Sequence, residues 1–193
     1  MKIISADFIK SAVKVEDFPK HSLPQFAFLG RSNCGKSSLI NMIVNRKNLV
    51  KTGSKPGMTQ LVNFFNINND FVLVDLPGFG YAEVPTAIRN GFMEMIKNFI
   101  TNAQKLKIVF LLVDIRRKPG VEEDKIVRFL FENNISTAII ATKADKLTKK
   151  EQADSIKNIA TFFEIDASSV FVSSSKNGNG KREIQTIISD YLS

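Results

Sequence analysis

The sequence predicts an α/β fold in which a mostly parallel β-sheet is covered by helices on both faces. Short, nearly continuous apolar segments alternate along the chain with segments whose apolar residues recur at helical spacing. Strands that read as uninterrupted apolar runs are typical of parallel sheets buried on both faces. The length of 193 residues corresponds to one domain, and 44% hydrophobic with 24% charged residues is an ordinary globular composition.

Six segments have the apolar or β-branched composition of strands: Gln25–Leu29, Leu61–Ile67, Phe71–Asp75, Lys107–Asp114, Thr137–Thr142 and Val170–Val172. Only Asn68-Asn69-Asp70 separates the second from the third, which is a hairpin signal. We therefore expect these two strands to be antiparallel neighbours, so that the six-stranded sheet is mixed.

Helices are expected where apolar residues recur every three or four positions: Leu39, Ile40 and Ile43; Ile88, Phe92, Met95, Ile96 and Phe99; Ile126, Phe129 and Leu130; Ile156, Ile159 and Phe163; Ile184, Ile187, Ile188 and Tyr191. Thr148 and Glu151 form a capping-box pattern before the fourth of these helices. Residues 1–22 are expected to be an N-terminal extension, and residues 23–193 the main domain.

Composition limits where the protein acts and what it binds. The longest apolar run, Ile108–Val113, is far shorter than the roughly 20 residues that span a bilayer. We do not expect the charged N-terminus to act as a signal peptide, and one cysteine forms no internal disulfide. We expect a cytoplasmic monomer that does not bind membranes. The net charge of +8 favours a polyanionic partner, although a basic solvated surface would also account for it.

Gly30-Arg31-Ser32-Asn33-Cys34-Gly35-Lys36-Ser37 matches the phosphate-loop pattern GxxxxGKS and lies between a predicted strand and a predicted helix. In such a loop, backbone N–H groups and the helix N-terminus face the phosphates. Lys36 is expected to reach the β- and γ-phosphates, and Ser37 to offer its hydroxyl to Mg²⁺. The pattern indicates nucleotide binding without naming the base.

Two further motifs end strands that reach the same edge of the sheet. Asp75-Leu76-Pro77-Gly78 supplies a carboxylate for Mg²⁺ and a glycine N–H for the γ-phosphate. In Thr142-Lys143-Ala144-Asp145, a carboxylate can accept both N–H donors of guanine, which adenine lacks, so GTP is favoured over ATP. Ser173-Ser174-Ser175 follows the last strand and fits the backbone that contacts guanine O6.

The second Mg²⁺ ligand is expected between the phosphate loop and Asp75. Thr52 and Thr59 are the candidate hydroxyls, and the turn-forming context of Pro56–Gln60 favours Thr59. The metal ligands are therefore expected to be Ser37, Thr59 and Asp75. Lys36, Thr59, Gly78 and Asn33 are the candidates for a catalytic role.

These motifs together resemble the EngB family of bacterial GTPases, also called YsxC or YihA. The segments that carry the resemblance are Gly30–Asn41, Pro56–Gln60, Asp75–Ala82, Val113–Arg116 and Thr142–Lys146. The resemblance implies a Ras-like P-loop G domain, assistance in assembling the large ribosomal subunit, and a role in cell division and septation. Met58 and Cys34 depart from the residues that are usual in the family.

The expected nucleotide-binding residues share the loops at one edge of the sheet: Gly30, Arg31, Ser32, Asn33, Cys34, Gly35, Lys36, Ser37, Ser38, Gly57, Met58, Thr59, Gln60, Leu61, Asp75, Leu76, Pro77, Gly78, Thr142, Lys143, Ala144, Asp145, Ser173, Ser174 and Ser175. The function expected is slow GTP hydrolysis to GDP and phosphate, accelerated by a partner, with the large ribosomal subunit or its precursor as that partner. One alternative is an RNA-binding assembly factor that nucleotide gates and in which hydrolysis is incidental. A G domain of an iron transporter is disfavoured because no apolar run is long enough to span a membrane.

Four smaller hypotheses concern individual positions. Phe79 stands where Ras-like enzymes place a glutamine that orients water, so hydrolysis should be slow. By the same resemblance Asn33 stands where related GTPases ligate K⁺, although it also suits a tight turn. Cys34 is either a thiol of lowered pKa or a small buried filler. Nine basic residues follow three strands and predict an RNA-binding rim: Arg116, Arg117, Lys118, Lys146, Lys149, Lys150, Lys176, Lys181 and Arg182.

Overall fold

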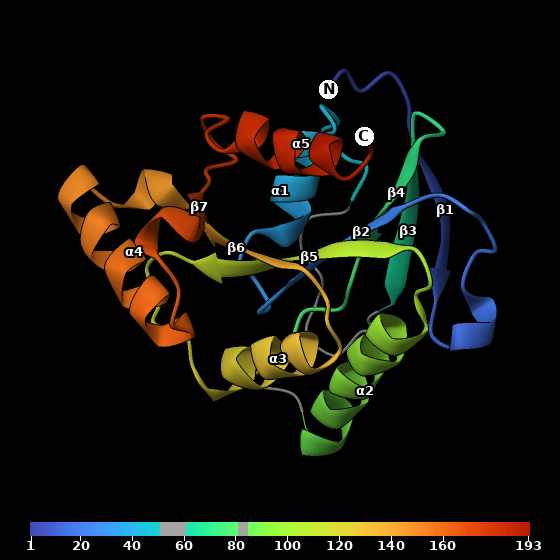
Figure 1. Ribbon diagram of the computed structural model, residues 1–193, viewed down its shortest axis with the longest axis horizontal. Helices are drawn as coiled ribbons and strands as arrows, with labels where there is room; N and C mark the ends of the chain where they lie inside the picture. The colour runs from blue at the N-terminus through green and yellow to red at the C-terminus, as the bar shows by residue number, and fades with distance from the viewer. Residues whose placement is uncertain (51–60, 81–84) are drawn as a thin grey trace.

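A seven-stranded sheet runs through the centre of the computed structural model, which describes residues 1–50, 61–80 and 85–193 (Figure 1). The strands are β1 (Ala6–Ala12), β2 (Gln25–Gly30), β3 (Val62–Ile67), β4 (Phe71–Asp75), β5 (Leu106–Asp114), β6 (Thr137–Thr142) and β7 (Val170–Val172). Their order is β1-β3-β4-β2-β5-β6-β7. β3 alone runs opposite to the other six strands, so the predicted mixed, mostly parallel sheet is confirmed.

The strand absent from the sequence prediction is β1, which makes seven strands rather than six. It pairs antiparallel with β3, from Ala6 opposite Ile67 to Ala12 opposite Val62, within the residues that we assigned to an N-terminal extension. It was missed because it is an edge strand with an exposed face and a shift of register between Phe8 and Lys10, which interrupts the two-residue period. The division of the chain at residue 22 stays a prediction.

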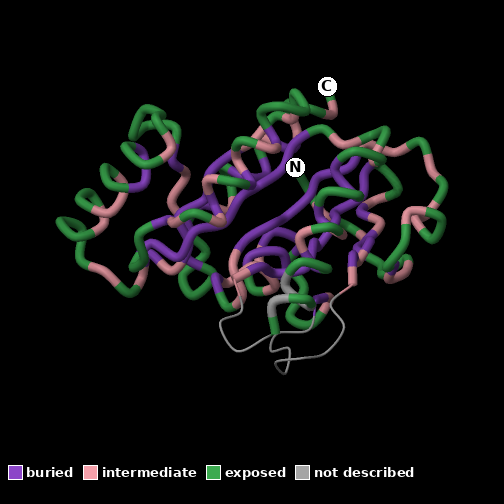
Figure 2. The backbone as a smooth tube through the Cα atoms, turned by 90° about the horizontal axis from the view of Figure 1, so that it is seen from below, coloured by how far each residue is buried: buried purple, intermediate pink, exposed green. Residues whose placement is uncertain are grey.

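Within the described residues, five α-helices cover the two faces of the sheet, as predicted (Figure 1). Helices α1 (Lys36–Ile43) and α5 (Lys181–Asp190) pack on one face, and α2 (Thr86–Asn102), α3 (Val121–Glu132) and α4 (Lys149–Phe163) on the other. The side chains of β2 alternate accordingly, because Phe26 and Phe28 join the first layer and Ala27 and Leu29 the second. Figure 2 shows the buried backbone concentrated in the strands between the helices.

Two local predictions are confirmed in detail. Asn68 and Asn69 both have positive φ, 55° and 58°, which is the conformation that a tight hairpin between β3 and β4 requires. Thr148 caps α4, and its hydroxyl and the Glu151 carboxylate form the expected capping box. Among the described helices, none has the length and hydrophobicity needed to cross a lipid bilayer.

The direction of the strands determines where a site can form. β2, β4, β5, β6 and β7 are mutually parallel, so their carboxyl ends reach one edge of the sheet. Open α/β sheets bind their ligands at this edge. The loops that follow these strands carry the phosphate loop and the two further motifs.

Candidate nucleotide-binding site

The phosphate loop leaves the end of β2 at Gly30 and leads into α1 at Lys36. Within the turn, Asn33 has φ 60° and Gly35 has φ 101°. Gly30 is required by packing, because a Cβ there would lie 2.6 Å from Cys34 Sγ and 2.8 Å from the Leu112 carbonyl oxygen. The loop is therefore folded tightly against β5, in the strand-turn-helix context that a phosphate loop needs.

The loop after β4 is joined to the phosphate loop by backbone hydrogen bonds. Ser32 N donates to Phe79 O at 2.8 Å, and Phe79 N donates to Gly30 O at 3.3 Å. The ammonium of Lys36 contacts the Asp75 carboxylate, and both side chains are largely buried. The structure thus brings together the expected phosphate lysine and the expected Mg²⁺ carboxylate.

The chemistry of the donor groups fits Mg²⁺. Ser37 supplies a hydroxyl and Asp75 a carboxylate, the hard oxygen donors that Mg²⁺ takes in small number beside phosphates and water. Asn63 lies beside the carboxylate, with its amide nitrogen 3.5 Å from Asp75 Oδ2. The other expected ligand, Thr59, and its alternative Thr52 lie outside the described residues. In the described ranges, no cluster of three or more His, Cys, Asp or Glu side chains could hold a metal without a nucleotide.

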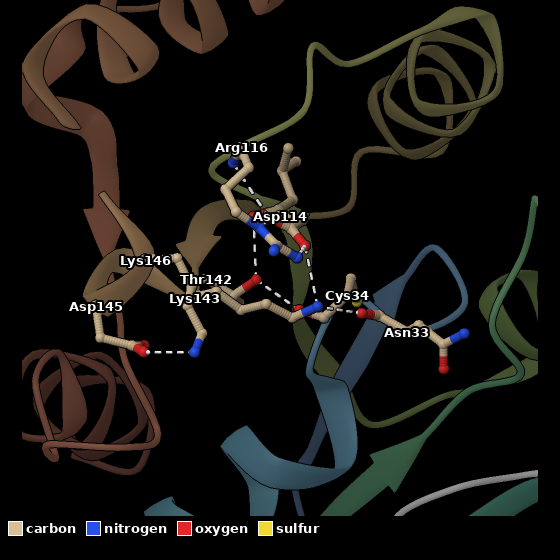
Figure 3. Close-up of polar contacts among 9 residues, drawn as sticks. Asn33, Cys34, Asp114, Arg116, Thr142, Lys143, Asp145 and Lys146 are labelled. Carbon is tan, nitrogen blue, oxygen red and sulfur yellow. Dashed lines mark hydrogen bonds and ion pairs between the residues drawn. The ribbon is translucent and has the colours of Figure 1, made fainter. Parts of the chain in front are cut away.

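The loop after β6 is fastened to the phosphate loop by two side chains (Figure 3). Thr142 Oγ1 donates to the Cys34 carbonyl oxygen at 2.6 Å, and Lys143 Nζ donates to the Asn33 carbonyl oxygen at 2.5 Å. These contacts join positions 108 and 110 residues apart in the sequence. The loops expected to bind phosphate and guanine therefore form one site.

Asp145 contacts the loop that follows β7, Ser173-Ser174-Ser175, which we call the serine loop. Ser174 Oγ donates to Asp145 Oδ1 at 2.6 Å, and this hydrogen bond lowers the pKa of the carboxyl group. Ala144 N donates to Ser173 O at 3.1 Å. The serine loop was predicted as backbone that contacts guanine, but the Ser174 side chain also orients the carboxylate. A cavity of about 440 Å³ opens here, lined by Ala144, Asp145, Lys149, Gln152, Asn177, Gly178 and Asn179.

The remaining predicted residues occupy different environments around the site. Leu76, Pro77 and Gly78 are buried, Leu61 is half-buried before β3, and Ser38 and Ser175 are exposed. Gly57, Met58, Thr59 and Gln60 lie outside the described residues.

The prediction of a thiol of lowered pKa at Cys34 is wrong. Its side chain is 3% exposed, and burial raises the pKa of the thiol to about 11, although Lys36 and Lys143 act in the opposite direction. Desolvation of the thiolate outweighs the nearby positive charges. The structure supports the other interpretation, a small buried residue that fills the space under Gly30.

Alkylation of the native protein by iodoacetamide at pH 8 is expected to be very slow. With a pKa of about 11, roughly one thiol in a thousand is ionised at that pH. The rate, followed by mass spectrometry, should be the same with and without GTP and should rise sharply in urea. Rapid labelling of the folded protein would contradict the buried position.

Sequence reasoning missed two charged contacts of the site. Asp114 ends β5 and pairs with both Arg116 and Lys143. Arg31 of the phosphate loop pairs with Glu122 and Glu123 at the start of α3, at 2.6 and 3.0 Å. A buried acidic residue that ends an apolar strand was a usable signal for Asp114. Arg31 and Glu122 are 91 residues apart, and no local pattern in the sequence indicates that they pair.

The chain is similar to known GTP-binding proteins. Residues 25–143 match the family model described as 50S ribosome-binding GTPase. The chain is 44% identical to a probable GTP-binding protein EngB of Treponema denticola, over 97% of this chain and 98% of the relative. It is 48% identical to the one from Syntrophotalea carbinolica, over 92% of this chain and 87% of the relative.

Solved structures show the same fold. The crystal structure of a probable GTP-binding protein engB has a TM-score of 0.73 at 25% identity, covering 87% of this chain and 98% of that one. Era in complex with MgGDPNP and nucleotides of 16S ribosomal RNA has a TM-score of 0.66 at 18% identity, covering 89% of this chain and 57% of that one. The Ras-like P-loop fold implied by the resemblance is confirmed. The chain belongs to the EngB family of GTP-binding proteins.

Proposed function

We propose that this protein binds GTP with Mg²⁺ and hydrolyses it slowly to GDP and phosphate. The observation that carries the proposal is the direct connection between the phosphate loop and the loop of Asp145, through Thr142 and Lys143. Both halves of a guanine nucleotide would thus meet one rigid edge of the sheet. Asp145 would accept the N–H donors of guanine, and Lys36 would neutralise charge on the phosphates.

Ser37, Asp75 and Thr59 are proposed to hold Mg²⁺ together with the phosphates. The ion would supply charge neutralisation between the β- and γ-phosphates. The contact of Lys36 with Asp75 supports this assignment. Before nucleotide binds, each side chain neutralises the other, and in the complex the phosphates would pair with Lys36 and Mg²⁺ with Asp75.

Slow hydrolysis follows from the position of Phe79. The residue is 3% exposed and belongs to the hydrophobic layer on the face of the sheet that α2, α3 and α4 cover, while its backbone hydrogen-bonds to the phosphate loop. An aromatic ring there cannot orient a water molecule as glutamine does. We expect turnover well below the usual enzymatic range of about 1–10³ s⁻¹. If Phe79→Ala abolishes basal hydrolysis but leaves folding and binding intact, Phe79 has a chemical role.

The proposed partner is the large ribosomal subunit or its precursor, in the cytoplasm, and loss of this step would account for a defect in cell division. Membership in a family described as 50S ribosome-binding GTPases supports it. The test is single-turnover hydrolysis and co-sedimentation, each with and without large-subunit particles, in GTP analogue and in GDP. Binding that depends on GTP, without any acceleration of hydrolysis, would favour the assembly factor in which hydrolysis is incidental.

We place the RNA-binding surface on the rim formed by the loops after β5, β6 and β7. Eight of the nine basic residues there are exposed, and Lys181 is half-buried beside Asn45. Arg116 is already engaged by Asp114, at 2.7 Å. Arg117 and Lys118, which are exposed in the same loop, are therefore better suited to contact phosphates.

Replacing both Arg117 and Lys118 with alanine should weaken binding to ribosomal particles and flatten its salt dependence. Each lost phosphate contact reduces the slope of log K against log [salt] by about one. The matched control is Lys105→Ala with Lys107→Ala, because this exposed pair lies at the opposite end of β5. GTP affinity should be nearly unchanged in both double variants. Equal slopes for the two would mean that the loop after β5 does not meet the RNA.

We further propose that K⁺ binds beside the phosphates at Asn33. The side chain of Asn33 is exposed in the phosphate loop, and an ion there would neutralise charge as an arginine finger does. Hydrolysis should then be faster in KCl than in NaCl at the same ionic strength, and Asn33→Ala should remove the difference. If the wild-type rates are equal in the two salts, Asn33 serves only the tight turn.

A further inference from the structure

The carboxylate of Asp114 is a buried junction between two loops at the carboxyl edge of the sheet (Figure 3). Its residue is 5% exposed, and it closes β5. Arg116 donates to it from the backbone N at 3.1 Å, from Nε at 2.9 Å and from Nη2 at 2.7 Å. Lys143 Nζ lies 2.9 Å from Asp114 Oδ2, the oxygen that also accepts from Arg116 Nη2.

Lys143 in turn bridges Asp114 and the phosphate loop. Its ammonium lies between the Asp114 carboxylate and the Asn33 carbonyl oxygen, which it reaches at 2.5 Å. The backbone of Lys143 is in the left-handed region, with φ 61°, which is uncommon for a residue other than glycine. Two oxygen acceptors on two separate elements therefore define where the side chain lies.

Stability alone does not explain this arrangement. Burial raises the pKa of Asp114, but the hydrogen bonds from Arg116 and Lys143 outweigh it and hold the pKa below its usual range. The side chains of the two cations remain 43% and 28% exposed, and ion pairs that water reaches add little to folding because the solvent screens their charges. What such a pair does provide is a single fixed geometry for the groups that it joins.

We propose that Asp114 is a positioning residue for the nucleotide: it holds the Lys143 ammonium against the phosphate loop, and Arg116 fixes the carboxylate. The proposal rests on GTP binding at this site. Asp114 acts through Lys143, which keeps the distance between the phosphate loop and the loop after β6 constant. Without the carboxylate, Lys143 is free to leave Asn33, and nucleotide binding must restore the order.

The first test measures Lys143 without any nucleotide. Each variant is treated with an N-hydroxysuccinimide ester, and acylation of each lysine is followed by mass spectrometry. Asp114→Asn should speed the acylation of Lys143 several-fold and leave Lys149 and Lys150 unchanged. The control is Asp124→Asn, which removes the exposed ion pair with Arg128 on α3. If the acylation rate of Lys143 is unaltered by Asp114→Asn, the positioning role is wrong, whether or not the protein binds GTP.

The second test is a double-mutant cycle on the affinity for a fluorescent GDP analogue. Asp114→Asn should weaken binding about tenfold in the wild-type background and have almost no effect in the Lys143→Met background. Arg116→Gln should weaken binding less, and it should have no effect in the Asp114→Asn background. A purely structural role predicts the same penalty in every background. Additive effects would therefore overturn the proposal, while a wild-type protein that binds no GDP would overturn the proposed function instead.

Discussion

Replacing Gly180 with alanine is expected to lower the free energy of unfolding by about 3 kcal/mol or more, the largest loss of stability that we predict for one methyl group. Gly180 precedes α5 with φ 80°, a left-handed conformation. A Cβ there would lie 2.4 Å from the Val172 carbonyl oxygen and 3.0 Å from Ser173 Cα. These are backbone and neighbouring atoms of the serine loop, which cannot move without disturbing the Ser174 contact to Asp145.

Gly178→Ala is the matched control for this substitution. Gly178 has the same φ of 80°, but no atom lies within 4 Å of its Cβ position. Gly178→Ala should lower the free energy of unfolding by only about 1 kcal/mol, the cost of placing a Cβ in the left-handed conformation. Urea denaturation of the two variants measures the difference. Equal losses would show that the crowding at Gly180 relaxes without cost.

Asp145→Asn is expected to weaken GTP binding by about 100-fold or more and to create affinity for xanthosine nucleotides. In the wild-type protein the Ser174 hydroxyl donates to Asp145 Oδ1 at 2.6 Å. The oxygen of an asparagine amide at this position can accept the same hydrogen bond. The NH₂ group then faces the N–H donors of guanine, which repels that base. Xanthine carries an oxygen where guanine carries its amino group, so it accepts a hydrogen bond from the same NH₂.

Competition between GDP and XDP measures this preference. Ser174→Ala serves as the comparison, because it removes the group that orients the carboxylate and leaves the carboxylate itself. This variant should bind GDP more weakly and retain its preference for guanine. If Asp145→Asn keeps wild-type GTP affinity and gains none for XTP, the base is not read at Asp145.

The sequence was sufficient for the elements that have a strong local signal. β4, β6 and β7 have the predicted bounds, and the other three predicted strands differ by one residue at an end. The three motifs also met as expected, because parallel strands carry the loops that follow them to one edge. In such a fold, the order of motifs along the chain is enough to place a phosphate loop beside a base-binding loop.

Contacts between distant side chains were beyond that reasoning. The raised pKa of Cys34 depends on burial by β5, which local spacing near Lys36 does not reveal. The Asp114 junction joins two loops that no periodic pattern relates. β1 was missed for a different reason, since an edge strand with a bulge lacks the apolar run by which buried strands are recognised.

The two outer strands have a consequence for self-association. A sheet of this kind remains open, so each outer strand offers backbone groups that could pair with a second copy of the chain. At one edge, the bulge in β1 and the charges of Asp7 and Lys10 disturb that surface. At the other, β7 is only three residues long. Neither edge is a long, regular template for cross-chain hydrogen bonding, so the open sheet is protected from edge-to-edge aggregation without being closed into a barrel.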